Sequence, residues 1–492
     1  MKFNKRITPF LFINILQMAW IAFPSVSIAE NLWEVYGLAM ENDAEYRGAL
    51  AENLAVRELG PQARASLLPN MKLNISRGKD DQDVRKGNFG RKGRYFFTRK
   101  GLELTITQPI YHKDRWIQLD KARLSMKQAD FTLAVARQKL IVRVAERYFD
   151  VLRAMDGVVF ARAEEKATDK QLRQARKRLE VGLVAITDVQ EAKAGFDIAV
   201  ARRIGAEVKL DDANEALREV TGEYSSGIDP LGEKVPLVFP EPNDVGEWTQ
   251  TALVKNLELA VKSQAEKVAM TEIKRIDARH LPKLDLVGAH NRASTGGGQY
   301  GHTDTRVSSI TLQLNLPIYE GGLVLSQSRE AMHRHSQAVA ELEKVKRSVE
   351  RKTHDAFWGV VSGVARVKAL RQALQSTKTA LDATRKGFEV GMRTSPDVLN
   401  RQRDMFEAKK EYASVRYDYL LDTLRLKQAA GTLSEEDILV INAYAERAFE
   451  HPKFRSLKNK DLVKGDAYTE AQPLSALARS ANMFLQMSRV LK

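Results

Sequence analysis

The sequence predicts an α+β membrane protein built from two structurally equivalent halves, and three observations lead to this fold class. The segment 181–189 recurs at 390–398, an offset of 209 residues (390 − 181). Proline is absent from 110–229 and from 318–395, where apolar residues recur every three or four positions. Short segments of alternating apolar and polar residues precede both stretches. Because solenoid repeats span only about 20–50 residues, each copy is half a protein.

The amino terminus predicts export. Cations at positions 2, 5 and 6 precede an apolar run over 7–21, and Ser27 and Ala29 supply the small residues expected before a cleavage site. The signal peptide should therefore span 1–29, with cleavage before Glu30. The later sequence nowhere approaches 18 consecutive apolar residues, the length typical of a spanning helix.

The composition excludes several kinds of site. The chain has no cysteine, so neither a disulfide framework nor a thiolate nucleophile or metal ligand is available. The net charge of +15 could indicate binding to nucleic acid or to anionic membrane surfaces. For an exported protein we expect the membrane surface and no nucleic acid, with most of the excess charge on solvated helix faces.

The two proline-free stretches predict very long helices. A helix from about Gly322 to Phe388 would extend roughly 100 Å at ~1.5 Å per residue. Helices of this length are typical of coiled-coil-like assemblies rather than of compact globules. Small residues such as Ala134, Ala136 and Ala380 would let neighbouring helices approach closely.

Four segments of period two predict β-strands, two in each half. They lie at about 70–78, 99–108, 283–292 and 306–316. An ordinary sheet with one wet face would show the same alternation, but the signal peptide and the lack of a long apolar helix favour strands between lipid and a water-filled lumen. About eight strands are needed before a barrel has an interior, so the barrel must be shared between subunits.

Several motifs together resemble the outer membrane efflux protein family. They are Glu30-Asn31-Leu32 with Val35-Tyr36, Gln108-Pro109-Ile110-Tyr111, and the segments 181–194, 316–322 and 429–433, and the resemblance reaches to about Ala448. It implies a homotrimer in the outer membrane of a Gram-negative bacterium. Four strands per subunit would make one 12-stranded β-barrel, continued into the periplasm by a long α-helical barrel with a mixed equatorial domain. The strand count and the helix lengths independently indicate the same architecture.

The chain should divide into four parts. The signal peptide at 1–29 precedes a first structural repeat at 30–240 and a second at 241–431. The remainder, 432–492, would be a C-terminal equatorial segment and a basic tail. Further equatorial material is expected at 222–245.

The resemblance implies an exit duct of a tripartite export system. Its partners would be a periplasmic adaptor protein and an inner-membrane transporter of the ABC or RND type, and type I protein secretion and multidrug efflux are equally open. The alternative is a structural or adhesive coiled-coil protein of the envelope. We expect no enzyme, because the sequence contains neither G-x-S-x-G nor H-E-x-x-H, and we expect no cofactor or metal.

The repeated Val-Gly motif lies where each long helix should turn into the next. Gly182 and Gly391 could adopt the positive φ that ends a helix. Thr187 with Gln190 matches a capping box, and the pair 395–396 (Ser-Pro) matches an N-cap followed by the first helical residue. Helix capping alone would explain all these residues.

The resemblance adds a functional interpretation of these turns. They would form the periplasmic tip of the channel, with Gly182 and Leu183 in the first turn and Gly391 and Met392 in the second. These four residues would contact the tip of the adaptor.

The resemblance also implies a gate beside the turns. Arg393 and Asp188 match residues that hold the entrance closed, whereas Phe388 replaces a tyrosine and lacks its hydroxyl. Asp397 matches one of two aspartates that ring the entrance, and Asn400 replaces the other. Asp397 could instead simply favour the amino end of its helix.

Three other features have simpler interpretations. The segment 79–94 contains six basic residues and is expected to be a loop that pairs with anionic outer-membrane lipid. The segment 296–301 fits G-x-G-x-x-G but lies between two strands, so we expect an extracellular loop. His333 and His335 should be surface residues, since their spacing differs from that of a helical metal site.

Overall fold

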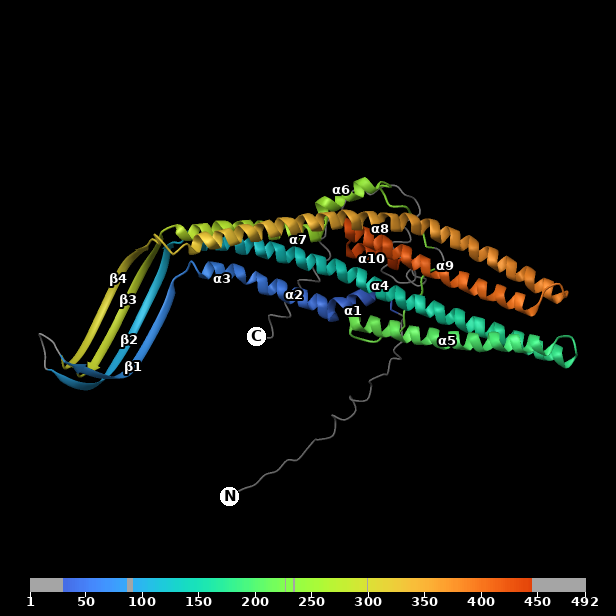
Figure 1. Ribbon diagram of the computed structural model, residues 1–492, viewed down its shortest axis with the longest axis horizontal. Coiled ribbons are helices and arrows are strands. Elements are labelled where there is room, and N and C mark those ends of the chain that lie inside the picture. Colours follow the sequence, from blue (N-terminus) through green and yellow to red (C-terminus); the bar gives the residue numbers. More distant parts are fainter. Residues whose placement is uncertain (1–29, 86–91, 226, 233–234, 299, 445–492) are drawn as a thin grey trace, which may run out of the picture.

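The computed structural model describes residues 30–85, 92–225, 227–232, 235–298 and 300–444 (Figure 1). The molecule is long and narrow, with a sheet at one end and helices that run to two tips at the other. The expected signal peptide and the tail from position 445 onward lie outside the described residues, as does 86–91 in the expected loop. No helix in the described ranges is both long and apolar enough to cross a membrane.

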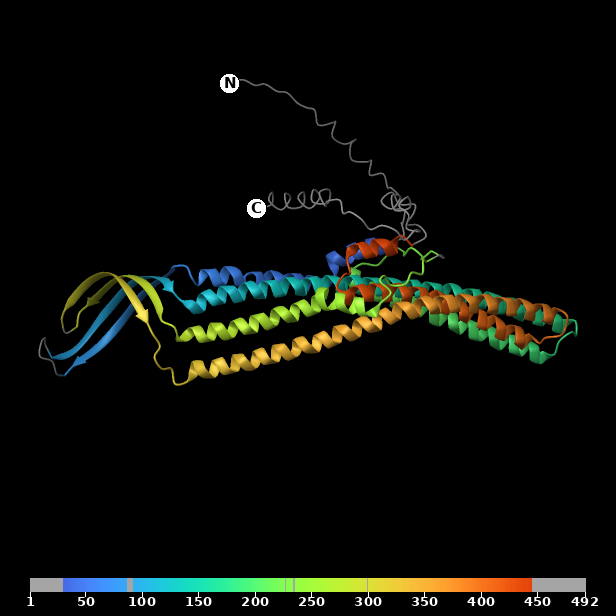
Figure 2. The ribbon, with the colours of Figure 1, turned by 90° about the horizontal axis from the view of Figure 1, so that it is seen from above.

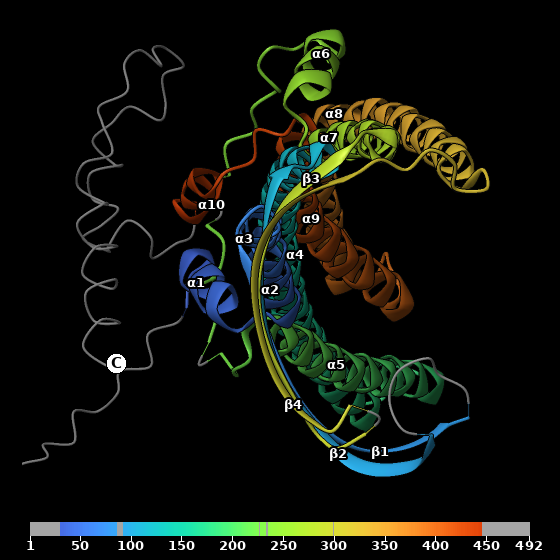
Figure 3. The same cartoon turned by 90° about the vertical axis from the view of Figure 1, so that its left-hand side faces the viewer.

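The four strands form one antiparallel sheet in the order of the chain. They are β1 (Asn70–Val84), β2 (Gly93–Tyr111), β3 (Lys283–Gly296) and β4 (His302–Asn315). Seen from its own end of the molecule, the sheet is strongly curved (Figure 3). The two strands of each half are hairpin neighbours, and β2 pairs with β3 to join the halves.

The expected basic loop, 79–94, is wrong at both of its ends. Lys79–Val84 belongs to β1 and pairs residue by residue with Gly93–Thr98 of β2. The hairpin therefore continues well past the point where apolar alternation ends. Ladder hydrogen bonds and the cross-strand ion pair between Arg94 and Asp81 support this extension, and neither needs an apolar face.

The helices repeat in the two halves. The elements of the first half are α1 (Leu32–Asn42), α2 (Ala44–Arg57), α3 (Leu59–Ala65), α4 (Lys113–Glu180) and α5 (Ile186–Thr221). Those of the second are α6 (Val245–Lys255), α7 (Leu257–Asp277), the short 3₁₀ turn η1 (Ala278–His280), α8 (Leu323–Glu389), α9 (Ser395–Ala430) and α10 (Glu435–Asn442). The long helices α4 and α8 have 68 and 67 residues, and α5 and α9 have 36 each.

These helices run side by side along the long axis (Figure 2). Each long helix folds back on its follower, so that α4 with α5 and α8 with α9 make two helical hairpins. The tips have only a small apolar core of their own, which in the first hairpin consists of Leu172, Ala175, Val189 and Ala192. With so little burial, the ends of the hairpins depend on caps and on neighbouring helices.

The main core lies midway along the molecule. Its fully buried residues include Phe149 of α4, Leu424 of α9, Val35 of α1 and Ile438 of α10. Helices α1 and α10 lie outside the curve of the sheet when the molecule is viewed end-on (Figure 3). They are tied together where Asn442 Oδ1 accepts a hydrogen bond from the backbone of Leu32. Of the segments expected to be equatorial, Ile228, Leu231, Leu433 and Ile441 contribute to this core.

Candidate functional site: the helical tips and the α4–α9 seam

The first tip is a left-handed turn that closes α4. Gly182 has φ +74°, and its N–H donates to the carbonyl of Leu179 at 2.9 Å. The N–H of Leu183 donates to the carbonyl of Arg178 at 2.8 Å. These two bonds make a Schellman motif, which satisfies the last carbonyls of the helix and requires a residue that tolerates positive φ.

The second tip repeats this geometry at the end of α8. Gly391 has φ +77°, and its N–H donates to the carbonyl of Phe388 at 3.2 Å. The N–H of Met392 donates to Gly387 at 2.8 Å. Leu183 and Met392 are 73% and 82% exposed, so each tip presents an apolar side chain to solvent in the single chain.

The caps of the returning helices differ from the sequence-based expectation. Thr187 is not an N-cap, because α5 already begins at Ile186 and the carboxylate of Asp188 accepts the N–H of Ala185 at 3.3 Å. In α9 the cap is Thr394, one residue earlier than expected, and Ser395 is the first helical residue. Thr394 suits the position because its backbone is extended and its hydroxyl accepts the N–H of Asp397.

Asp397 completes this cap from the other side. Its carboxylate accepts the backbone N–H of Thr394 at 3.0 Å and the threonine hydroxyl at 2.9 Å. The backbone hydrogen bond is the main cause that lowers the pKa of Asp397, and the charges of Arg393 and Arg401 contribute. The geometry thus supports helix capping for Asp397, while Asn400 lies exposed one turn further along α9.

The expected gate residues do not all meet within one chain. In the described part of the chain no ion pair joins Asp188 to Arg393. The aromatic ring of Phe388 instead lies under the guanidinium of Arg178, which is 4.7 Å from the ring centroid. This cation–π contact links α8 to α4 across the two tips. Sequence reasoning missed it because nothing local in either segment indicates a partner about 200 residues away.

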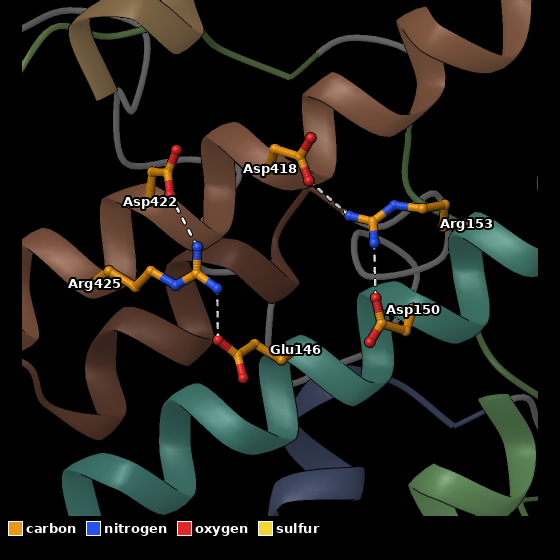
Figure 4. Close-up of polar contacts among 6 residues, drawn as sticks. All are labelled: Glu146, Asp150, Arg153, Asp418, Asp422 and Arg425. Carbon is orange, nitrogen blue, oxygen red and sulfur yellow. Dashed lines mark hydrogen bonds and ion pairs between the residues drawn. The ribbon is translucent and has the colours of Figure 1, made fainter. Parts of the chain in front are cut away.

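A second group of charges holds α4 against α9 nearer the middle of the molecule (Figure 4). Arg425 of α9 binds Glu146 of α4 at 2.7 Å and Asp422 of its own helix at 3.2 Å. Burial raises the pKa of Asp422, against the lowering effect of Arg425. The guanidinium therefore stabilises a carboxylate that its surroundings alone would disfavour.

A second group of the same kind lies one turn away, with the arginine on α4 and its cross-helix acid on α9. Arg153 of α4 binds Asp418 of α9 at 2.7 Å and Asp150 of its own helix at 2.7 Å (Figure 4). Both helices carry an acid, a second acid four residues later and an arginine three residues after that, at 146–153 and 418–425. This shared spacing was the signal that could have revealed the seam, because antiparallel helices with the same pattern can bridge reciprocally.

The other candidates from the sequence, the histidine pair and the G-x-G-x-x-G segment, lie where a structural role explains them. His335 Nε2 lies 2.7 Å from Glu266 of α7, which ties α8 to its neighbour. The described residues contain no cluster of three or more His, Cys, Asp or Glu side chains that could hold a metal ion. The G-x-G-x-x-G segment falls at the turn between β3 and β4, and no helix follows it there.

Comparison with known proteins agrees with this geometry. The model of the outer membrane efflux protein family matches residues 35–223 and 248–432. The outer membrane protein TolC of Vibrio cholerae is 36% identical over 422 residues, covering 84% of this chain and 94% of that protein. TolC of Escherichia coli is 33% identical over 453 residues, covering 89% of each. The alkaline protease secretion protein AprF of Pseudomonas aeruginosa is 29% identical, covering 85% of this chain and 88% of that protein.

Solved structures show the same fold at lower identity. The CmeC outer membrane channel of Campylobacter jejuni superposes with a TM-score of 0.72 at 15% identity, covering 85% of this chain and 91% of that one. The outer membrane protein VceC of Vibrio cholerae gives 0.69 at 18% identity, covering 81% and 96%. The match to the family model spans both halves of the chain and includes both helical tips. The chain therefore belongs to the outer membrane efflux protein family and is an outer-membrane channel for export.

Proposed function

We propose that three copies of this chain close their sheets into one 12-stranded barrel and form the exit duct of a tripartite export system. The observation that carries this proposal is the open sheet. In the single chain β1 and β4 are edge strands, and every residue of β4 is exposed. Lipid does not tolerate unpaired backbone groups, so the edges need partners. Joining β4 of one copy to β1 of the next satisfies both edges without any new element.

The two tips are proposed to contact a periplasmic adaptor, which couples the duct to an inner-membrane transporter. Gly182 with Leu183 and Gly391 with Met392 give the same turn and an outward apolar side chain in both hairpins. Two equivalent turns in each of three chains would present six similar contact points. Such exposed apolar side chains support a role in binding another protein.

The gate is proposed to involve contacts between chains. Arg393 is exposed and Asp188 is held at the start of α5, so both remain available to a neighbouring hairpin. Three copies of Asp397 would ring the entrance, with Asn400 reducing the number of carboxylates from six to three. Phe388 supplies no hydroxyl to this gate, and its ring contacts the guanidinium of Arg178.

The relatives support both proteins and small molecules as cargo. Some are named for protease secretion, as in the Pseudomonas aeruginosa and Dickeya chrysanthemi proteins. Another, the CzcC protein of Cupriavidus metallidurans, is named for cobalt, zinc and cadmium resistance. A passive duct makes few specific contacts with cargo, so we assign selectivity to the inner-membrane transporter. A purely structural or adhesive role is not favoured.

The state of assembly tests this proposal directly. Protein extracted from membranes in mild detergent should migrate as a trimer, and this trimer should give single-channel conductance in planar bilayers. The monomer should not insert stably because its sheet edges are open. A monomer with full channel activity would overturn the architecture.

A further inference from the structure

The pairing register shows that one face of the sheet is apolar over only part of its length. Residues paired across an antiparallel sheet point to the same face. Ile75 pairs with Leu102, and two residues further toward the helices Leu73 pairs with Leu104. The same face also carries Met71, Ile106, Leu286, Ile310, Leu312 and Leu314. The opposite face carries mostly polar residues such as Asn74, Glu103, Thr105 and Gln313.

Beyond the apolar part, this same face becomes basic. Arg77 pairs directly with Lys100, and Arg292 pairs directly with Arg306. All four side chains are exposed in the single chain. Arg77 follows Ile75 by two residues, or about 7 Å along the strand. We call these four residues the basic band.

The basic band has too little negative charge of its own. Like charges directly opposite one another destabilise a strand pair. Arg292 is compensated by Asp304 at 3.1 Å, but within the described residues neither Arg77 nor Lys100 forms an ion pair. The opposed pair of Arg77 and Lys100 is therefore best explained by an anion that comes from outside the chain.

Three other cations near the end of the hairpin form ion pairs. Arg94 pairs with Asp81, Arg85 pairs with Asp83 at 2.8 Å, and Arg99 pairs with Asp80 at 2.6 Å. Among the described residues, Arg77 and Lys100 lack such a partner.

The position of the basic band defines its environment. The helices leave the sheet from the end opposite to the basic band, since β2 leads into α4 and β4 into α8. If the three sheets form a barrel with the apolar face toward lipid, as proposed above, the basic band lies at the outer boundary of the apolar belt. That boundary is the level of the headgroups of the outer leaflet.

We propose that Arg77, Lys100, Arg292 and Arg306 bind the phosphate groups of the anionic glycolipid in the outer leaflet. A phosphate can accept hydrogen bonds from a guanidinium in bidentate fashion and from a lysine at the same time. A phosphate between the side chains of Arg77 and Lys100 would convert their repulsion into two attractive contacts. Three chains would give a ring of such contacts around the barrel.

Lipid binding to the purified trimer tests the proposal. The trimer in mild detergent is titrated with diphosphorylated lipid A, with the same lipid lacking phosphates, and with inorganic phosphate, and bound ligand is counted by native mass spectrometry. Arg77→Gln/Lys100→Gln should weaken binding of diphosphorylated lipid A on the order of 30-fold, because two headgroup contacts are lost. Wild type should bind the lipid without phosphates much more weakly.

A matched control lies on the same two strands. Lys72→Gln/Arg99→Gln removes the same charge from the opposite face and should change binding by less than about twofold. An equal loss in both double variants would overturn the proposal, as would equal binding of lipid with and without phosphates. Binding of inorganic phosphate as tight as that of the lipid would also overturn it, since the site would then be one for small anions.

Two further measurements separate this proposal from the proposed channel. Single-channel conductance of wild type and of each variant reports on the barrel itself, independently of lipid binding. The single change Arg306→Gln, on edge strand β4, repeats the binding test if the double variant does not assemble, and it should weaken binding about fivefold. If the Arg306→Gln trimer conducts and keeps wild-type affinity for diphosphorylated lipid A, the proposal that the basic band binds lipid phosphate is wrong.

Discussion

At the scale of single residues, two glycines with the same backbone conformation serve different purposes. Gly391 at the second tip and Gly431 at the end of α9 have φ values of +77° and +74°. A methyl group on Gly391 would meet no heavy atom within 4 Å. On Gly431 it would lie 2.2 Å from the carbonyl oxygen of Lys255 and 2.8 Å from the Cα of Asn256. The first glycine is needed for its conformation, and the second also for close packing.

These surroundings predict different costs for the same substitution. Gly391→Ala should destabilise the tip by about 1–2 kcal/mol, the cost of a left-handed alanine, and Gly391→Asn should cost less. Gly431→Ala should lower the melting temperature of the trimer far more, because two backbone segments must separate. Thermal melting and hydrogen exchange of the tip amides measure the two effects. Equal melting temperatures for both alanine variants would refute the packing role of Gly431.

Residue-scale features could be predicted only where the signal is local. The positive φ of Gly182 and Gly391 follows from a helix that must end between two helical segments. The N-cap at Thr394 was missed by one residue because Thr394 and Ser395 both have the required hydroxyl, and only the backbone path decides between them. The contact of Arg178 with Phe388 depends on the packing of α4 beside α8, which no local pattern encodes.

At the scale of elements, the long helices followed closely from the sequence while the strand ends did not. The expected helix from about Gly322 to Phe388 corresponds to α8, Leu323–Glu389. Proline and glycine mark its ends, and neither depends on distant contacts. The strands extend beyond their apolar parts because backbone pairing continues wherever a partner strand is present. Apolar alternation therefore indicates where a strand meets lipid rather than where it ends.

The seam between α4 and α9 predicts an asymmetric effect of removing charges. Arg425→Gln leaves Glu146 and the partly buried Asp422 without this guanidinium, so it should cost more than Glu146→Gln. We expect about 0.5–1.5 kcal/mol for Arg425→Gln, since its side chain is 48% exposed and solvent screens the pair. Asp422→Asn in the same chain should recover part of that loss. Chemical denaturation followed by circular dichroism measures each step.

A control for the seam lies on the same helix. Arg401 of α9 pairs at 3.2 Å with Asp404 three residues away, in the same helix, and its side chain is 56% exposed. Arg401→Gln should therefore have little effect on stability. If Asp422→Asn adds its full cost to that of Arg425→Gln, the two residues are not coupled and the seam rests on apolar packing.

At the scale of the whole molecule, the sheet end and the helical tips differ in how firmly they must be held. The sheet has two open edges, β1 and β4, and both need partners in a membrane. The helical tips have a small core and depend on caps and on contacts such as Arg178 with Phe388. An assembly that is fixed at one end and weakly held at the other is suited to a duct that opens at its periplasmic end. In the gate that we propose at this end, single side chains should therefore have the largest functional effect.

Conductance in planar bilayers tests the gate. Arg393→Ser should raise it by a large factor, because it removes a charge-assisted bond between hairpins and Phe388 offers no hydroxyl in its place. Phe388→Tyr should act in the opposite sense and stabilise the closed state by about 0.5–1.5 kcal/mol.

Asn400→Asp should leave closure unchanged but strengthen block by cations, since six carboxylates would then ring the entrance. Lys386→Ser removes an exposed cation from the last turn of α8, provides the matched control and should leave conductance unchanged. Wild-type conductance in Arg393→Ser would mean that helix packing, and not this arginine, keeps the channel closed.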